Sequence, residues 1–214
     1  MTLDVAGRVV GWIGAVIGLG TLGLALLSMV RSLRRPSGRV EPGARIVLRL
    51  PLLLVATLGF FVAGVWLWRP LPVRLEPGLQ ILLSAGGIIL LSGGCGLYLW
   101  GLRSLGQMFA PSSGFGVRLN AGHRLIVSGP YARVRHPMYL AVIIAALGSV
   151  LLYRTWATLA FAVLMLGLVV RARREEHVLA QEFGQEWREH AARVPAWLPR
   201  LRRKPPSAAP GSHE

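Results

Sequence analysis

Acidic residues are scarce in this chain and unevenly placed. Its 214 residues include only 9 Asp and Glu against 24 Lys and Arg, which gives a formal net charge of +15. No acid lies between Glu76 and Glu175, and five of the nine fall between Glu175 and Glu189. A cationic ligand that needs a carboxylate therefore has few places where it can bind.

Charged residues of both signs are also few, at 15%, while hydrophobic residues make up 53%. A soluble domain carries about a quarter charged residues, so this composition excludes an ordinary soluble protein. The basic residues lie between long apolar runs and do not line one polar face, which argues against a nucleic-acid partner. We expect a membrane protein whose basic residues meet anionic lipid headgroups.

The one cysteine, Cys95, lies in an apolar run and has no partner for an intramolecular disulfide.

Five apolar runs predict an all-α integral membrane bundle of about five transmembrane helices. A crossing needs about 20 residues, and three runs are long enough. The last two are shorter and meet at "YRTW", which predicts a short C-terminal helical hairpin. The five runs are Val9 to Val30, Ile46 to Trp68, Leu79 to Trp100, Met138 to Tyr153 and Thr155 to Val170.

Arginines and lysines are concentrated after the first run, between residues 103 and 137, and from Arg171 onward. The positive-inside rule then places the N-terminus outside and the C-terminus in the cytoplasm. The first run is followed by "RSLRRPSGR" and not by a small-residue cleavage site, so we expect it to stay as an anchor. We divide the chain into N-terminal spans (1–102), a core (103–200) and a disordered basic tail (201–214).

Small residues within the runs predict close helix packing. Gly14 and Gly18 are four apart, and Gly93, Gly94 and Gly96 lie together. Such spacing lets helices approach closely.

Polar residues that could form a site lie on one side of the predicted membrane. They fall in the loop 103–137 and in a helix-like stretch from Arg171 to His190. Arg171 and Glu175 are four apart, which in a helix is typical of an ordinary surface ion pair. The functional alternative is that Glu175 faces the loop that contains His136 and there holds a charged ligand.

The segment "HRLIVSGPYARVRHPMY", followed by "RARREEHVLAQEFGQEWREHAARVP", resembles the isoprenylcysteine carboxyl methyltransferase family and its phospholipid methyltransferase relatives. The resemblance covers His123 to Pro195. It implies a membrane enzyme that transfers a methyl group from S-adenosylmethionine, held in a cytoplasmic cofactor pocket, to a lipophilic acceptor that enters from the bilayer. Arg171 corresponds to the arginine near the acceptor, and Glu176 and Gly116 are further candidates. The implied cofactor contacts are His123, Arg124, Leu125, Ile126, Tyr131, His136, Pro137, Met138, Tyr139 and Glu175.

The chemistry of S-adenosylmethionine is compatible with these residue types. Tyr131 and Tyr139 offer ring faces to a cation, worth roughly 0.5 to 2 kcal/mol each. Pro130 and Pro137 fix backbone dihedral angles and so give the loop a defined shape. The transfer itself needs no metal, and Arg171 favours an anionic acceptor because a guanidinium binds carboxylates in a bidentate fashion.

Other classes of membrane protein fit the sequence less well. The histidines and glutamates lack a recognisable metal-ligand spacing, and a transporter would carry more ionisable residues within its spans. A non-catalytic membrane scaffold or binding protein with the same fold is the alternative that stays open. The identity of the acceptor, the choice among O-, N- and S-methylation, and the oligomeric state are also open.

Overall fold

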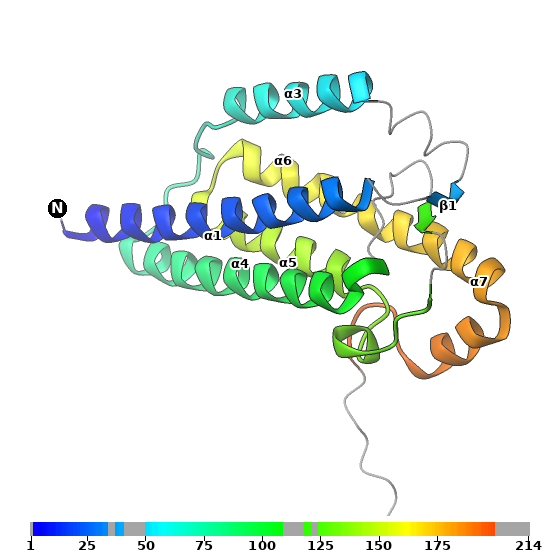
Figure 1. The fold of residues 1–214 in the computed structure, drawn as a ribbon. Coiled ribbons are helices and arrows are strands. Elements are labelled where there is room, and N and C mark those ends of the chain that lie inside the picture. Colours follow the sequence, from blue (N-terminus) through cyan, green and yellow to red (C-terminus); the bar gives the residue numbers. More distant parts are fainter. Residues whose placement is uncertain (1, 34–36, 41–49, 109–117, 121–123, 200–214) are drawn as a thin grey trace, which may run out of the picture.

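The computed structural model describes residues 2–33, 37–40, 50–108, 118–120 and 124–199. Figure 1 shows long helices lying side by side, with the polar C-terminal part of the chain at one end of the bundle. The helices are α1 (Thr2–Leu33), α3 (Leu50–Trp66), α4 (Pro77–Leu105), α5 (Pro137–Tyr153), α6 (Trp156–Met165) and α7 (Gly167–Arg193), with 3-10 turns η1 (Gly106–Met108) and η2 (Gly129–Ala132).

Three helical segments are long and apolar enough to cross a membrane: Gly7–Ser32, Pro77–Leu105 and Trp156–Arg193. The chain is therefore an integral membrane protein. Two shorter apolar helices, Thr57–Trp66 and Pro137–Tyr153, coincide with the second and fourth predicted runs. The helical prediction is confirmed, while a total of five crossings stays a prediction.

The all-α prediction misses one small element. Strands β1 (Ser37–Val40) and β2 (Arg118–Asn120) pair antiparallel, with Ser37 opposite Asn120. Their register is irregular, and neither segment is long enough to show an alternating pattern. The predicted tail 201–214 and the proposed contacts His123 and Gly116 lie outside the described residues.

Glycines spaced seven apart on α4 allow α5 to pack directly against its backbone. A Cβ atom at Gly94 would lie 2.6 Å from the backbone nitrogen of Ala145 and 2.7 Å from the carbonyl oxygen of Ala141. Gly87 meets the backbone of α5 in the same way, whereas a Cβ atom at Gly101 would lie 2.7 Å from the side chain of Met138. A spacing of seven returns to the same helix face after two turns, so the row forms one continuous contact.

The predicted glycine contacts are confirmed in part. Gly94 packs as described, and a Cβ at Gly14 would lie 2.6 Å from the side chain of Leu152. The other three, Gly18, Gly93 and Gly96, have no neighbouring atom within 4 Å of such a Cβ in the described structure. The sequence clusters glycines correctly in the spans, but it does not show which of them face another helix.

The turn between α5 and α6 is tight and well bonded. Arg154 adopts a left-handed conformation (φ 50°, ψ 47°), and its guanidinium donates to the Ser84 hydroxyl at 3.2 Å. Thr155 caps α6 and forms a reciprocal capping box with Thr158. Two residues therefore suffice to reverse the chain at "YRTW".

Helix α7 begins as a continuation of α6 and later bends sharply. Leu166 keeps helical dihedral angles (φ −62°, ψ −25°) between the two helices. At 38 residues, Trp156–Arg193 is far longer than a crossing needs, so its polar part from Arg171 projects beyond the apolar layer. Gly184 has a non-helical conformation (φ 51°, ψ −114°), and beyond it the last turns double back (Figure 1).

Candidate functional site

The site lies where the loop before α5 meets the polar part of α7. Pro130 and Pro137 each occupy the first turn of a helix, where a proline suits the backbone because its nitrogen needs no hydrogen bond there. Both prolines are fully buried. Gly129 has φ +61°, and a Cβ there would collide with the Ser104 side chain. The loop thus has a defined shape, as the sequence predicts.

Tyr139 links two charged residues of α7. Its hydroxyl donates to Oε2 of Glu175 at 2.5 Å and accepts from Nε of Arg171 at 2.8 Å. The Arg171 guanidinium carbon lies 5.4 Å from the centre of the Tyr139 ring. The expectation that the "RHPMY" segment and the "EE" pair face each other is confirmed.

A second network lies beside the first and involves the next carboxylate. Nε2 of His136 lies 2.8 Å from Oε1 of Glu176, and Nη1 of Arg135 lies 3.3 Å from the same oxygen. The His136 residue is only 5% exposed. Tyr139 is thus paired with Glu175, and His136 with Glu176.

Burial and neighbouring charges alter the pKa values of Tyr131 and Glu176. Burial, followed by the negative charge of Glu175, raises the pKa of the Tyr131 phenol, so its hydroxyl stays protonated and can donate. The hydrogen bond from His136, with the charges of Arg135 and His136, lowers the pKa of Glu176, although burial acts in the opposite direction. Glu176 is therefore a carboxylate at neutral pH.

The remaining predicted contacts are placed unevenly. Met138 is buried, and its side chain lies against Gly101 of α4. Arg124 is exposed, and Leu125 and Ile126 are half-buried. We call the residues of the two networks the cluster; they are Arg135, His136, Tyr139, Arg171, Glu175 and Glu176. None of the hydrogen bonds or ring contacts described for the cluster involves Arg124, Leu125 or Ile126. Their role at the cofactor stays a prediction.

Sequence reasoning missed three residues in or beside the cluster. Arg135 stacks on Trp187, 5.8 Å from the ring centre, and its buried Nε has no hydrogen-bond partner in the part of the chain that the structure describes. The ring of Trp197 lies 5.6 Å from that of His136. No pattern in the sequence shows that Trp187 contacts Arg135 of the loop or that Trp197 contacts His136.

Comparison with known proteins covers this region. Residues 82–186 match the profile of the family described as Phospholipid methyltransferase. The match covers 105 of the 214 residues, just under half of the chain. The family is one of membrane methyltransferases that use S-adenosylmethionine.

Curated relatives of the phospholipid methyltransferase segment fall into two groups. Protein-S-isoprenylcysteine O-methyltransferase B of Arabidopsis thaliana is 36% identical over 85 residues, which are 39% of this chain and 43% of that protein. Cobalt-zinc-cadmium resistance protein CzcN of Cupriavidus metallidurans is 38% identical over 79 residues, 36% of each chain. Nickel-cobalt-cadmium resistance protein NccN of Alcaligenes xylosoxydans xylosoxydans is 42% identical over 82 residues, 36% of this chain and 37% of that protein. The matches thus span less than half the length of these relatives.

The phospholipid methyltransferase match contains both networks but stops before the end of α7. Tyr139, Glu175 and Glu176 lie inside it, while Trp187 and Trp197 lie beyond residue 186. Within the described ranges, no three His, Cys, Asp or Glu side chains come together as a metal site.

Proposed function

We propose that this protein is an integral membrane methyltransferase that uses S-adenosylmethionine to methylate a lipophilic acceptor. The observation that carries the proposal is the pair of networks that join the start of α5 to α7. Tyr139 binds Glu175 and Arg171, and His136 and Arg135 converge on Glu176. Both lie in the segment that matches the family.

The residues of the cluster suit the functional groups of S-adenosylmethionine. The cofactor carries a sulfonium, an ammonium, a carboxylate, a ribose and an adenine. Glu175 would accept from the ammonium or ribose, and the protonated hydroxyl of Tyr131 would donate. The buried Nε of Arg135 is an N–H donor without a partner among the described residues, which fits the need of a carboxylate ligand.

Bound S-adenosylmethionine would supply an electrophilic methyl carbon for a single in-line displacement by the acceptor. The chain's own residues bind and orient. Tyr139 holds Arg171 and Glu175 in fixed positions, so that Arg171 can receive an anionic acceptor. The buried prolines and His136 limit the access of water, which strengthens these charged interactions.

We further propose that the acceptor is an isoprenylcysteine-type carboxylate or a related lipid or lipophilic small molecule. A carboxylate needs no general base because it is already ionised. An amine or thiol would need one, and Glu175, Glu176 or His136 could serve. Arg171 would also bind a lipid phosphate, so both acceptor classes are compatible with the site.

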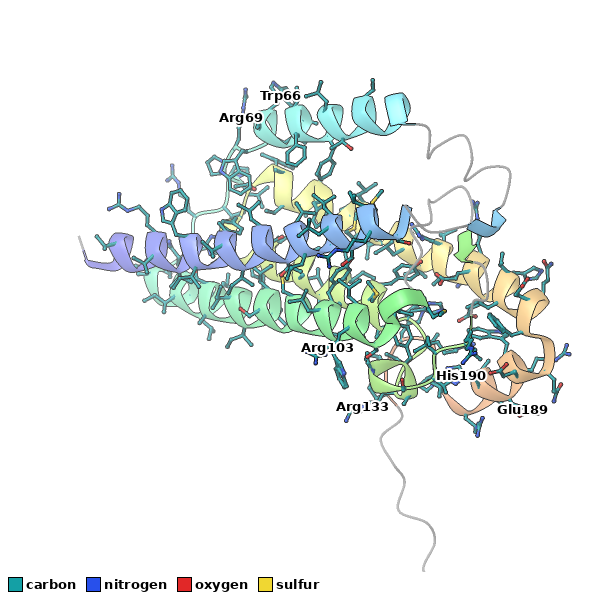
Figure 2. All side chains as sticks on the ribbon, in the orientation of Figure 1. Trp66, Arg69, Arg103, Arg133, Glu189 and His190 are labelled. Atoms are coloured by element: carbon teal, nitrogen blue, oxygen red, sulfur yellow. The ribbon has the colours of Figure 1, made fainter. Side chains whose placement is uncertain are left out.

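The distribution of charge supports a cytoplasmic site. Figure 2 shows Arg103 and Arg133 at the end of the bundle that carries the cluster, and Arg69 at the other end. The loop 103–137 and the chain from Arg171 hold most of the basic residues. The positive-inside rule then places this end, with the C-terminus, in the cytoplasm.

The proposal is tested with the full chain in lipid nanodiscs. Calorimetry should show binding of S-adenosylmethionine, and incubation with radiolabelled cofactor and a membrane lipid extract should yield a labelled lipophilic product. Glu175→Gln should weaken cofactor binding about 10- to 100-fold, because a hydrogen bond to a charged group contributes roughly 1.5 to 3 kcal/mol. Glu186→Gln, an exposed carboxylate further along α7, should leave binding unchanged.

Two results would contradict this function. If the folded full chain binds no S-adenosylmethionine, the cofactor assignment is wrong. If it binds the cofactor but labels no acceptor from any lipid extract, the alternative of a non-catalytic membrane protein with this fold is favoured.

A further inference from the structure

The chain returns to the cluster after leaving it along α7. The left-handed φ of 51° at Gly184 turns the last part of α7 back, and Figure 1 shows these turns lying under the end of the bundle. In Figure 2, His190 lies at the same end as Arg133. The segment that follows, residues 194–199, we call the return segment.

The return segment is bonded to the backbone of the loop before α5. The amide of Arg135 donates to the carbonyl of Pro195 at 2.9 Å, and the amide of His136 donates to that of Ala196 at 3.2 Å. These are consecutive amides directly ahead of Pro137, which has none to offer. The return segment thus supplies the hydrogen-bond acceptors for two backbone amides that do not form hydrogen bonds within a helix.

Aromatic contacts accompany these hydrogen bonds. The ring of His136 stacks on that of Tyr139 with centres 5.6 Å apart and planes 8° apart. Trp197 contacts the same histidine at 5.6 Å with a tilt of 35°. His136 is therefore restrained by two rings and by the carboxylate of Glu176.

We propose that Trp197 is a positioning residue of the cofactor site, and that the return segment completes this site. Trp197 holds the imidazole of His136 in the orientation in which it bonds Glu176 and stacks on Tyr139. The expected effect on cofactor binding rests on the proposed function. The contact between Trp197 and His136 does not depend on that function. Residues 194–199 lie beyond the family match, which ends at 186, so the match does not assign them any role.

The two backbone hydrogen bonds between the loop and the return segment are tested by hydrogen exchange, an experiment that needs no cofactor. In the full chain, a peptide covering residues 133–138 should exchange slowly at the Arg135 and His136 amides. Deletion of residues 194–214 should make both amides exchange rapidly, whereas deletion of 201–214 should leave them slow. Equal exchange in the two deletion variants would overturn the return segment's role.

The positioning role is tested by calorimetric titration of full-chain variants with S-adenosylmethionine. Trp197→Ala should weaken binding about three- to tenfold, since the loss of one aromatic contact accounts for a change of that size. Trp197→Phe should restore most of it. The matched control is Leu198→Ala, because the neighbouring Leu198 side chain is 73% exposed.

A further readout separates positioning from general stability. In the active protein, Trp197→Ala should raise the KM for S-adenosylmethionine with little change in kcat and in the thermal midpoint of unfolding. If the wild-type chain binds the cofactor and Trp197→Ala binds it equally well, the positioning role is refuted. If the wild-type chain does not bind it at all, the proposed function fails, while the exchange experiment still decides whether the return segment holds the loop.

Discussion

Replacement of Gly94 by alanine should loosen the contact between α4 and α5, and Gly93→Ala is its matched control. At Gly94 the new methyl group would lie 2.6 Å from the nitrogen of Ala145 and 2.7 Å from the oxygen of Ala141. These are backbone atoms, so no side-chain rotation can relieve the overlap. At Gly93 the methyl group meets nothing within 4 Å among the described atoms. Only the first substitution therefore forces the helices apart.

The size of the effect follows from the difference between the two variants. Alanine is favoured over glycine in a helix by about 1 kcal/mol. Both sites are helical, so this gain is the same in the two variants and does not contribute to the difference between them. Overpacking costs about 1 to 3 kcal/mol. Gly94→Ala should therefore be less stable than Gly93→Ala by about 1 to 3 kcal/mol, or roughly 2 to 12 °C in the midpoint of thermal unfolding.

The assay is thermal unfolding of both variants in the same nanodiscs, followed by cofactor titration. Gly94→Ala should also weaken S-adenosylmethionine binding, since α5 carries Tyr139 at the end of this contact. Equal midpoints for the two variants would show that the α4–α5 contact is not as close as the structure has it, and the reasoning would fail at its first step.

Three further substitutions test other contacts by thermal unfolding. Tyr153→Phe removes the 2.8 Å hydrogen bond from the phenol to the carbonyl of Gly11, and should lower stability by about 0.5 to 1.5 kcal/mol; no change would show that α1 is not held there. Thr155→Ala removes the cap of α6 and should lower stability by about 1 kcal/mol, which Thr155→Ser should largely restore. Because the pKa of Glu176 is lowered on folding, its carboxylate stabilises the fold above its ordinary pKa of 4.5, and this stabilisation is lost as the pH falls through the lower folded value. Glu176→Gln should reduce that acid dependence, and an unchanged pH profile would contradict the pairing with His136.

The positions of α1 and α4 could be predicted from the sequence because their apolar runs are long and free of charge. Val9 to Val30 lies within α1, and Leu79 to Trp100 lies within α4. The ends differ by several residues, since α1 begins at Thr2 and α4 continues to Leu105. Hydrophobicity marks the part of a helix that contacts lipid, whereas polar residues at its ends are equally compatible with helix and loop.

The pairing of carboxylates with loop residues could not be predicted to the same detail. Glu175 and Glu176 are neighbours on α7, and successive residues point about 100° apart around a helix axis. Which of them meets His136 depends on the rotation of α7 about its axis, and that rotation is set by packing against the bundle. The family resemblance identified the pair, but only the structure assigns Glu175 to Tyr139 and Glu176 to His136.

The bend at Gly184 and the return of the chain to the loop could not be predicted from the sequence, for a different reason. Gly184 lies in a polar stretch that favours helix on both sides, so the sequence predicts one continuous helix from Arg171 to His190. Its positive φ is a conformation that glycine adopts readily, but a glycine in a helix does not by itself indicate a bend. The contact between Arg135 and Pro195 joins residues far apart in the chain, and no local pattern encodes it.

The close contact between α4 and α5 and the return segment act on the same residues from two directions. The glycine row fixes the position of α5, and with it Tyr139, relative to α4. The return segment fixes the loop that ends at His136 through two backbone hydrogen bonds. Glu175 and Glu176 bond to these two residues, so the orientation of α7 follows from both restraints. A variant that weakens either restraint should therefore impair cofactor binding without removing any group that contacts the cofactor.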